Sequence, residues 1–303
     1  MHQVAVFSSS SDITASSGVN LEVVAGLVRT TQLADFPVTC LGEENAYEIA
    51  IPDGLIEDST HQDTMLTSLR QPADTRSIDV NLVPGNNRRK KLLIADMDST
   101  IITGESLDDM SQLAGMAEKI FPITRRAMRG ELDFEEALDA RLALLAGQPE
   151  SLIAAALNQA ELTAGAKTLV ATMRANGAFC YLVSGGFTVI TGPIAEQCGF
   201  HDHQANILEV HNGALMGRVK KPVLDSDAKA GFLTQYCKEH SLTPDDAACI
   251  GDGANDLAML SMAGYGVAFK GKPLLRAKVR LQLNHTDLTG LLFLQGYHAE
   301  EFA

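Results

Sequence analysis

Short apolar runs alternate with helix-like segments along most of the chain from residue 91 onward. Four runs have the length and composition of buried strands, and they cover residues 92–95, 179–183, 247–250 and 266–269. Three segments between them have helical spacing or stop at a glycine, and they cover residues 166–176, 189–198 and 228–240. Repeated strand–helix–strand units predict an α/β fold with a parallel sheet that helices cover on both faces.

A long segment of helical pattern, residues 106–160, separates the first predicted strand from the second. It is too long to be a single crossover helix between two parallel strands. The sequence therefore predicts a small helical cap, inserted at about residues 106–160, above the carboxyl ends of the strands.

The first 80 or so residues have a different pattern, without any candidate catalytic cluster. Short apolar runs lie between polar stretches, at residues 4–7, 21–28, 38–41 and 78–83. We expect a small α+β module over residues 1–85 and the main domain over residues 86–303. Residues 84–91 are rich in turn-forming and basic residues, so they read as a linker whose basic run is solvated surface.

The composition narrows the range of partners. The chain has 303 residues, of which 46% are hydrophobic, and a net charge of −14. An acidic balance argues against nucleic acid and anionic membranes, which need clustered Lys and Arg, and favours a small-molecule partner. No apolar stretch reaches membrane-spanning length and no basic, then apolar, leader opens the chain, so we expect a cytoplasmic protein. Five cysteines without C-x-x-C spacing predict reduced, mostly buried thiols.

Two carboxylates directly follow the first predicted strand of the main domain. Asp96 and Asp98 come after the apolar residues 92–95. Open α/β sheets carry their chemistry just beyond the carboxyl ends of the strands, so an acidic pair at this position favours a bound cation. The alternative is a strand end or helix start that the two side chains merely cap.

Three further motifs occupy corresponding places later in the chain. Ser184, Gly185 and Gly186 follow the second predicted strand and are expected to open a helix; Lys229 lies near a helix start; and residues 251–256 (GDGAND) follow the third strand. The alternatives are a helix cap at Ser184, a surface charge at Lys229 and a capping loop at 252–256. Jointly, in this order on alternating strands and helices, the motifs favour one shared crevice and an enzyme.

The residue types suit magnesium-dependent phosphoryl chemistry. Asp96, Asp252 and a backbone carbonyl near Asp98 could supply the hard oxygen ligands of Mg²⁺. Ser184 and the two glycines after it could cradle a phosphate with a hydroxyl and backbone N–H groups. Lys229 could hold a phosphoryl oxygen and screen the repulsion between a carboxylate and a phosphate dianion.

The two carboxylates at the strand end would then have separate tasks. Asp96 is placed to attack phosphorus and form an aspartyl-phosphate. Asp98 could protonate the leaving alcohol and afterwards take a proton from the water that cleaves the acyl-phosphate.

The same motifs resemble those of the haloacid dehalogenase-like phosphohydrolases: D-x-D-x-T at 96–100, Ser184, Lys229 and G-D-x-x-x-D at 251–256. More narrowly, DMDSTIITGE at 96–105, MRGELDF at 128–134, SGGF at 184–187 and GDGAND at 251–256 resemble the phosphoserine phosphatase family. The similarity covers about residues 91–292. It implies a Rossmann-like core with a small helical cap and Mg²⁺-dependent hydrolysis of O-phosphoserine to serine and phosphate, the last step of serine biosynthesis.

The resemblance also implies a role for each matching residue. Asp96 is the nucleophile and a metal ligand, Asp98 the acid/base whose backbone carbonyl binds metal, and Asp252 the third metal ligand. The phosphate is held by Ser184, Gly185, Lys229 and Asn255. Asp256 orients Lys229 or a metal-bound water.

The cap residues implied by the resemblance suit a zwitterionic substrate. Glu105 matches the acid that faces the substrate ammonium, Arg141 matches the arginine that faces its carboxylate, and Met128 and Phe134 form a nearby apolar wall. Unpaired charges under a closed lid are costly, so an amino acid needs one partner of each sign. The alternative is that Glu105 and Arg141 are ordinary charges of the helix surface.

Other functions remain open at this point. A phosphotransferase, or a phosphatase for another small phosphate ester, would share all four motifs. A binding module without turnover would not need the intact acids and Lys229, and a glycosyltransferase with a D-x-D metal site would not need Ser184 or Lys229. Related enzymes often carry an ACT-like regulatory or dimerising module before the catalytic domain, so residues 1–85 could be ACT-like and support a homodimer, or be a structural appendage.

Overall fold

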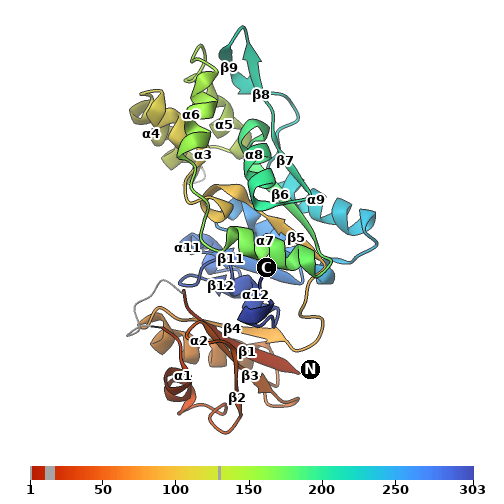
Figure 1. The fold of residues 1–303 in the computed structure, drawn as a ribbon. Coiled ribbons are helices and arrows are strands. Elements are labelled where there is room, and N and C mark those ends of the chain that lie inside the picture. Colours follow the sequence, from red (N-terminus) through yellow and green to blue (C-terminus); the bar gives the residue numbers. More distant parts are fainter. Residues whose placement is uncertain (1, 11–17, 129–130) are drawn as a thin grey trace.

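The computed structural model describes residues 2–10, 18–128 and 131–303, apart from the side chain of Met128. Its centre is a six-stranded sheet of order β12-β11-β10-β5-β6-β7, in which every pairing is parallel (Figure 1). The strands are β5 (Leu92–Ala95), β6 (Phe179–Phe187), β7 (Asp202–Asn206), β10 (Ala247–Gly251), β11 (Tyr265–Phe269) and β12 (Leu281–Leu283).

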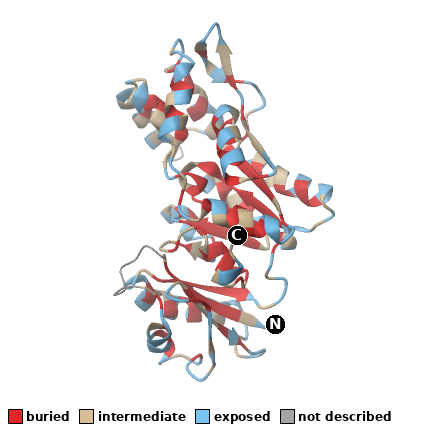
Figure 2. Cartoon of the chain, in the orientation of Figure 1, coloured by how far each residue is buried: buried red, intermediate tan, exposed pale blue. Residues whose placement is uncertain are grey.

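Helices cover both faces of this sheet, which confirms the predicted three-layer α/β core. The helices are α7 (Ala166–Ala175), α8 (Thr188–Cys198), α9 (Ser226–Glu239), α10 (Leu257–Met262), α11 (Pro273–Arg276) and α12 (Gly290–Leu294). Alternate residues of β5 point to opposite sides: Leu93 packs in the core with α7, α8 and α12, while Leu92 packs with α9 and α10. Strand β5 is therefore buried on both faces, and Figure 2 shows the buried residues concentrated along the sheet.

The four predicted strands are present, but the end of the second was predicted wrongly. Ser184, Gly185 and Gly186 do not open a helix; they lie inside β6, which runs to Phe187, and α8 begins at Thr188. The side chain of Asn206 in β7 donates to the Gly185 carbonyl at 2.8 Å, and Phe187 pairs with Asn206. The neighbouring strand thus keeps this segment extended.

The cap stands above the strand ends and contains four α-helices among the residues that the structure describes (Figure 1). They are α3 (Ser106–Leu113), α4 (Ala117–Met128), α5 (Phe134–Ala143) and α6 (Ser151–Gln159). A hairpin that the sequence pattern did not predict, β8 (Leu208–His211) with β9 (Ala214–Val219), joins them: the backbones of Gly147 and Gln148 bond to Leu215 at 2.8 Å. The cap is therefore built from two separate parts of the chain.

The N-terminal segment forms the predicted α+β module. Its elements are β1 (Gln3–Ser8), α1 (Leu21–Val28), β2 (Val38–Gly42), β3 (Ala46–Ile51), α2 (Ser59–Asp74) and β4 (Asp79–Pro84). The antiparallel sheet has the order β2-β3-β1-β4, so the βαββαβ chain order gives a ferredoxin-like arrangement. Helices α1 and α2 bury one face of this sheet, while Val4, Val6 and Val83 on the other face join the core that contains α12.

Polar side chains connect edge strand β4 of the module to edge strand β12 of the main sheet. The Asn81 side chain donates to the carbonyl of Gln282 at 2.8 Å and accepts from its N–H at 2.9 Å. The Asp79 carboxylate accepts from the backbone N–H groups of Asn284, His285 and Thr286 at 2.8 to 3.0 Å. Hydrogen bonds from a side-chain amide and a carboxylate to backbone groups therefore connect the edges of the two sheets.

The basic run before β5 was predicted to be solvated surface, and this holds for the exposed Arg89 and Lys91 but not for the half-buried Arg88 or the buried Lys90. Lys90 is buried, and its Nζ donates to the carbonyls of Asn87 and Asp245 at 2.8 and 2.7 Å. Arg88 pairs with Glu48 of the module at 2.8 Å. Arg88 also donates to the carbonyls of Phe293 and Leu294 at 3.3 Å, so this one guanidinium connects the module to the main domain.

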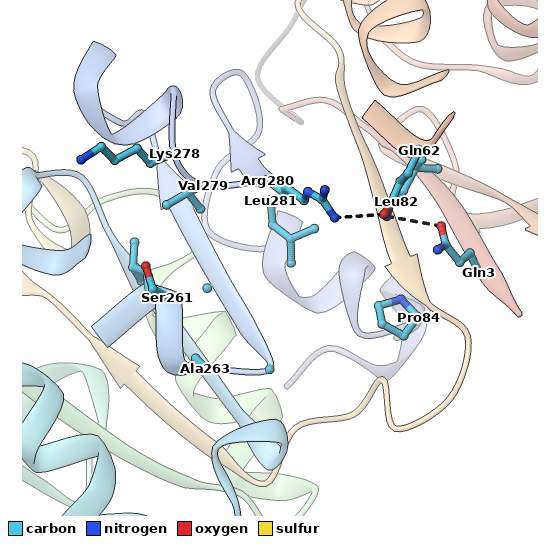
Figure 3. A pocket seen from close by; sticks show the side chains of 13 residues that line it. Gln3, Gln62, Leu82, Pro84, Ser261, Ala263, Lys278, Val279, Arg280 and Leu281 are labelled. Carbon is cyan, nitrogen blue, oxygen red and sulfur yellow. Dashed lines mark hydrogen bonds between the residues drawn. The ribbon is translucent and has the colours of Figure 1, made fainter. Parts of the chain in front are cut away.

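A cavity of about 400 Å³ lies beside this junction, between β1, α2 and β4 of the module and α10, β11 and β12 of the main domain (Figure 3). Arg280 donates to Gln62 Oε1 at 3.1 Å, and Gln62 donates to Gln3 Oε1 at 3.4 Å across its rim. Each of these polar side chains therefore has a partner within the protein.

Replacing Asp79 by Asn is expected to lower the free energy of unfolding by about 2 kcal/mol, because an amide nitrogen would face backbone N–H donors that the carboxylate now satisfies. Urea unfolding at neutral pH measures this. Asp74→Asn is the matched control, since Asp74 is exposed and its carboxylate accepts no backbone N–H among the described residues but lies 3.2 Å from the His285 ring. An Asp79→Asn protein as stable as the control would contradict the role of Asp79 at the junction.

Two remaining expectations concern cysteines and membranes. All five cysteines are free, and four of them, all except Cys40, are buried, as predicted. Among the helices that the structure describes, none is both long and apolar enough to cross a membrane.

Candidate active site

Asp96 stands at the carboxyl end of β5, in the middle of the sheet. Its N–H donates to the carbonyl of Ile250 in β10 at 3.0 Å, and its Oδ1 accepts from the N–H of Met97 at 2.8 Å. The side chain is 5% exposed. Ser99, three residues further on, has φ +53°, in the left-handed region, and its N–H donates to the carbonyl of Gly104 at 2.9 Å.

Lys229 from α9 lies between two buried carboxylates. Its Nζ is 2.7 Å from Asp96 Oδ1 and 2.7 Å from Asp256 Oδ1, and its side chain is 1% exposed. Asp256 Oδ2 accepts from the N–H of Gly253 at 3.0 Å. Burial opposes the charged form, but Asp256 and Asp96 together hold the pKa of Lys229 above its usual value, so the ammonium stays charged.

Asp252, Asp256 and Asp96 form a buried carboxylate cluster. One oxygen from each lies within 4.8 Å of the other two. The ammonium groups of Lys229 and Lys272 contact this cluster. Three hard, anionic oxygen donors suit a divalent cation that prefers oxygen ligands. The residues therefore fit a metal ion.

The Asp98 carboxylate accepts hydrogen bonds from the start of the cap and from β6. Its Oδ1 accepts from the N–H of Ser106 at 2.7 Å, and its Oδ2 accepts from the Ser184 hydroxyl at 3.4 Å. Burial, assisted by the nearby negative charge of Glu105, raises the pKa of Asp98 to about 6. An acid of this strength exchanges protons near neutral pH, as general acid/base catalysis requires.

The end of β6 lies against Asp98. Ser184 Oγ accepts from the N–H of Gly186 at 2.9 Å. A Cβ on Gly186 would lie 3.0 Å from Asp98 Oδ2 and 3.1 Å from Ser184 Oγ, and one on Gly185 would lie 3.0 Å from the Phe134 ring. Both positions are crowded, so glycine lets the backbone approach the site closely.

The cap and its hinge contribute charges of both signs. Glu105, the residue before α3, accepts from Ser99 Oγ at 2.9 Å and from Lys272 Nζ at 3.4 Å. Arg141 in α5 donates from Nε to the Ala137 carbonyl at 3.0 Å. Burial lowers the pKa of Arg141, whereas the acidic charges of Asp108, Glu105 and Asp98 oppose that shift, so these groups lie near its guanidinium.

The remaining candidates are placed less tightly. Phe134 begins α5 and its ring faces Gly185. Asn255 Oδ1 occupies the position that a Cβ on Gly253 would take, in the loop that carries Asp252. Met128 ends α4, but its side chain lies outside the described residues.

Two polar residues near the site were not singled out from the sequence. Lys272 lies three residues beyond β11, the strand next to β10, and contacts Asp252 Oδ2 at 3.0 Å. Asp108 on α3 has a buried Oδ1 without a hydrogen-bond partner among the described residues. Only the position of Lys272 after a predicted strand could have signalled its place, because strand ends of a parallel sheet meet at one edge.

Residues 93–261 match the family model described as haloacid dehalogenase-like hydrolase. The chain belongs to the haloacid dehalogenase-like hydrolase family. The resemblance drawn from the four motifs is thereby confirmed, and the part of this hydrolase that carries them lies at the ends of β5, β6 and β10 and in α9.

Similar proteins extend the match beyond the hydrolase core. The chain is 36% identical to the phosphoserine phosphatase SerB2 of Mycobacterium tuberculosis over 284 residues, which are 93% of this chain and 66% of that protein. It is 41% identical to the phosphoserine phosphatase of Lactococcus lactis, over 67% of this chain and 94% of that protein. This hydrolase thus spans slightly less than two thirds of the longer relative.

Solved structures of the family share the fold. A haloacid dehalogenase family hydrolase from Salmonella enterica serovar Typhi aligns with a TM-score of 0.84 and 26% identity, over 97% of this chain and 98% of that chain. A structure described as a phospho-aspartyl intermediate analogue of phosphoserine phosphatase aligns with a TM-score of 0.64 and 35% identity, over 68% of this chain and 98% of that one. The first alignment includes the ferredoxin-like module, whereas the second has the length of the hydrolase core.

Proposed function

We propose that this hydrolase cleaves O-phosphoserine to serine and inorganic phosphate through an aspartyl-phosphate on Asp96, as the last step of serine biosynthesis. The observation that carries the proposal is the Asp96 carboxylate, buried at the end of the central strand and 2.7 Å from the ammonium of Lys229. Relatives named phosphoserine phosphatase, one of them 41% identical, support the substrate.

In the first half-reaction a carboxylate oxygen of Asp96 attacks phosphorus as the ester bond to the serine oxygen breaks. Asp98, whose pKa of about 6 leaves part of it protonated near neutral pH, gives its proton to that oxygen, and serine leaves as a neutral alcohol. In the second half-reaction Asp98 takes a proton from water, which attacks phosphorus and breaks the bond to Asp96. Phosphate leaves and both carboxyl groups return to their starting state.

Other residues are proposed to hold the phosphoryl group. Lys229 places a buried positive charge beside Asp96, which reduces the repulsion between the nucleophile and the dianion. The Ser184 hydroxyl, the backbone of Gly185 and the Asn255 side chain are proposed to bind phosphoryl oxygens. Asp256 keeps the Lys229 ammonium in place through its 2.7 Å contact.

Mg²⁺ is the proposed cofactor. Asp96, Asp252 and the backbone carbonyl of Asp98 would hold it, and the buried carboxylate cluster has the donor chemistry that it prefers. When bound, the ion supplies positive charge to the phosphoryl oxygens.

The cap residues are proposed to select the amino acid. Glu105 would pair with the substrate ammonium and Arg141 with its carboxylate, and Phe134 and Met128 would form the apolar wall. The electrostatic influence of Glu105 on both Asp98 and Arg141 supports a common site for these groups. All of this chemistry falls within residues 86–303, the proposed catalytic domain, and none within residues 1–85.

Phosphate release from a panel of esters tests the proposal. The panel contains O-phospho-L-serine, O-phospho-D-serine, 3-phosphoglycerate, glycerol phosphate and p-nitrophenyl phosphate, each with Mg²⁺ and again with excess chelator. We expect the highest kcat/KM for phosphoserine and no release with chelator. A higher kcat/KM for an ester without an amino group would contradict phosphoserine as the substrate. Turnover in the presence of chelator would contradict the need for a metal ion.

Replacing Glu105 by Gln is expected to lower the ratio of kcat/KM for phosphoserine to that for p-nitrophenyl phosphate by about 10- to 100-fold, because a charge-assisted contact to the ammonium is lost. Initial rates of phosphate release measure the ratio. Glu118→Gln, an exposed carboxylate in the first turn of α4, is the matched control. An unchanged ratio for Glu105→Gln would rule out its role in recognition.

A further inference from the structure

Lys272 connects the metal-ligand loop to the hinge of the cap. It precedes α11, and its N–H donates to the carbonyl of Asp252 at 2.8 Å. Its Nζ lies 3.0 Å from Asp252 Oδ2 and 3.4 Å from Glu105 Oε1. One ammonium therefore ties the loop after β10 to the residue at which the chain enters the cap.

The contacts on Glu105 are all on one of its two oxygens. Ser99 Oγ and Lys272 Nζ both approach Oε1, at 2.9 and 3.4 Å. Within residues 2–10, 18–128 and 131–303, Oε2 forms no hydrogen bond or ion pair. The side chain is 45% exposed, so this oxygen is available to a ligand while the other is held.

Glu105 needs a counter-ion because its surroundings are acidic. Its negative charge acts on Asp98, Asp108, Asp109 and Asp252. Without a cation in contact, repulsion from four carboxyl groups would favour conformers of Glu105 that turn outward to solvent. Lys272 is the ammonium that contacts it among the described residues, and Arg141 lies near enough to act on it electrostatically but forms no ion pair with it there.

We propose that Lys272 is a specificity-determining positioning residue, which holds Glu105 Oε1 so that Oε2 is presented to the ammonium of the substrate. This inference rests on the proposed phosphoserine phosphatase function. Lys272 itself touches neither the reacting phosphorus nor the nucleophile. Its removal is therefore expected to weaken recognition of the amino group more than the chemical step.

The test compares Lys272→Met with Lys272→Arg, using full-length protein and saturating Mg²⁺. Values of kcat and KM are measured for O-phospho-L-serine and for p-nitrophenyl phosphate, which has no ammonium. Lys272→Met is expected to raise KM for phosphoserine about fivefold to tenfold with a smaller change in kcat, and to lower the phosphoserine to p-nitrophenyl phosphate ratio of kcat/KM by the same factor. Lys272→Arg, which keeps the positive charge, is expected to restore most of the ratio.

Lys278→Met is the matched control, because it removes the same charge six residues away, beside the cavity between module and main domain. Equal losses on both substrates would mean that Lys272 acts through Asp252 on the metal loop, and would overturn the proposal, as would an unchanged ratio. Lys272→Gln provides a second neutral variant if the Met protein does not fold. A wild-type protein that releases phosphate from p-nitrophenyl phosphate but not from phosphoserine would instead disprove the proposed function.

Discussion

Replacing Asp96 by Asn is expected to lower phosphate release from O-phosphoserine by a factor on the order of 10⁴ or more, because a neutral amide cannot attack phosphorus. The fold should survive the change. The Asn oxygen can still accept from the N–H of Met97 and from Lys229, and Lys229 keeps its contact with Asp256. Phosphate release under saturating substrate and Mg²⁺, with urea unfolding in parallel, measures both effects.

The matched control for this substitution is Asp98→Asn, two residues along the same turn. Asp98 is proposed to move protons and not to bond to phosphorus, so its variant should slow turnover and still form the acyl-phosphate. Mass spectrometry of acid-quenched protein is expected to find a phosphate adduct at position 96 in Asp98→Asn and none in Asp96→Asn. An adduct at any other residue would refute the assignment of the nucleophile.

Three of the four catalytic motifs, all except Lys229, could be predicted from the sequence because each follows a short apolar run typical of a buried strand. Residues 92–95 and 247–250 include no polar residue, so the sequence predicts that both strands lie in the buried middle of the sheet. Parallel strands end at one edge, which brings Asp96 and Asp252 together although 156 positions separate them. Neither inference needed information on packing.

The strands that the sequence did not predict lack such a signal. Strand β7, DHQAN, has one apolar residue and exists because it pairs with β6. Strand β12 has three residues and depends on β11. The error at Ser184 has the same origin, since the Asn206 side chain that keeps Gly185 extended belongs to the neighbouring strand. The neighbouring strands, and not the local pattern of apolar and polar residues, determine where these strands form.

The place of Lys272 in the site could not be predicted from spacing for a similar reason. Its partner Glu105 is 167 positions away, and neither residue lies in a repeated pattern. Lys229 and Lys272 differ in whether a sequence motif accompanies them. Lys229 was singled out because it sits near a helix start between two motif strands, whereas Lys272 follows the last predicted strand without any accompanying motif.

Replacing Lys229 by Met is expected to abolish turnover and also to destabilise the metal-free protein, by about 3 to 5 kcal/mol. The side chain is 1% exposed and neutralises two carboxylates that are themselves buried, Asp96 and Asp256. Met fills the space of the lysine stem but leaves both acids without a cation. Urea unfolding with chelator measures the stability, and phosphate release with Mg²⁺ measures turnover.

A second substitution separates the two losses. Asp256→Asn in the Lys229→Met background removes one of the stranded carboxylates, so it should recover a large part of the lost stability while turnover stays absent, because no positive charge returns beside Asp96. Asp227→Asn, on the first turn of the same helix, is the control for an acidic residue outside the cluster. If the double variant were as unstable as Lys229→Met, the loss would arise from packing of the lysine stem and not from unpaired charge. If it regained turnover, Lys229 would have no electrostatic task in the reaction.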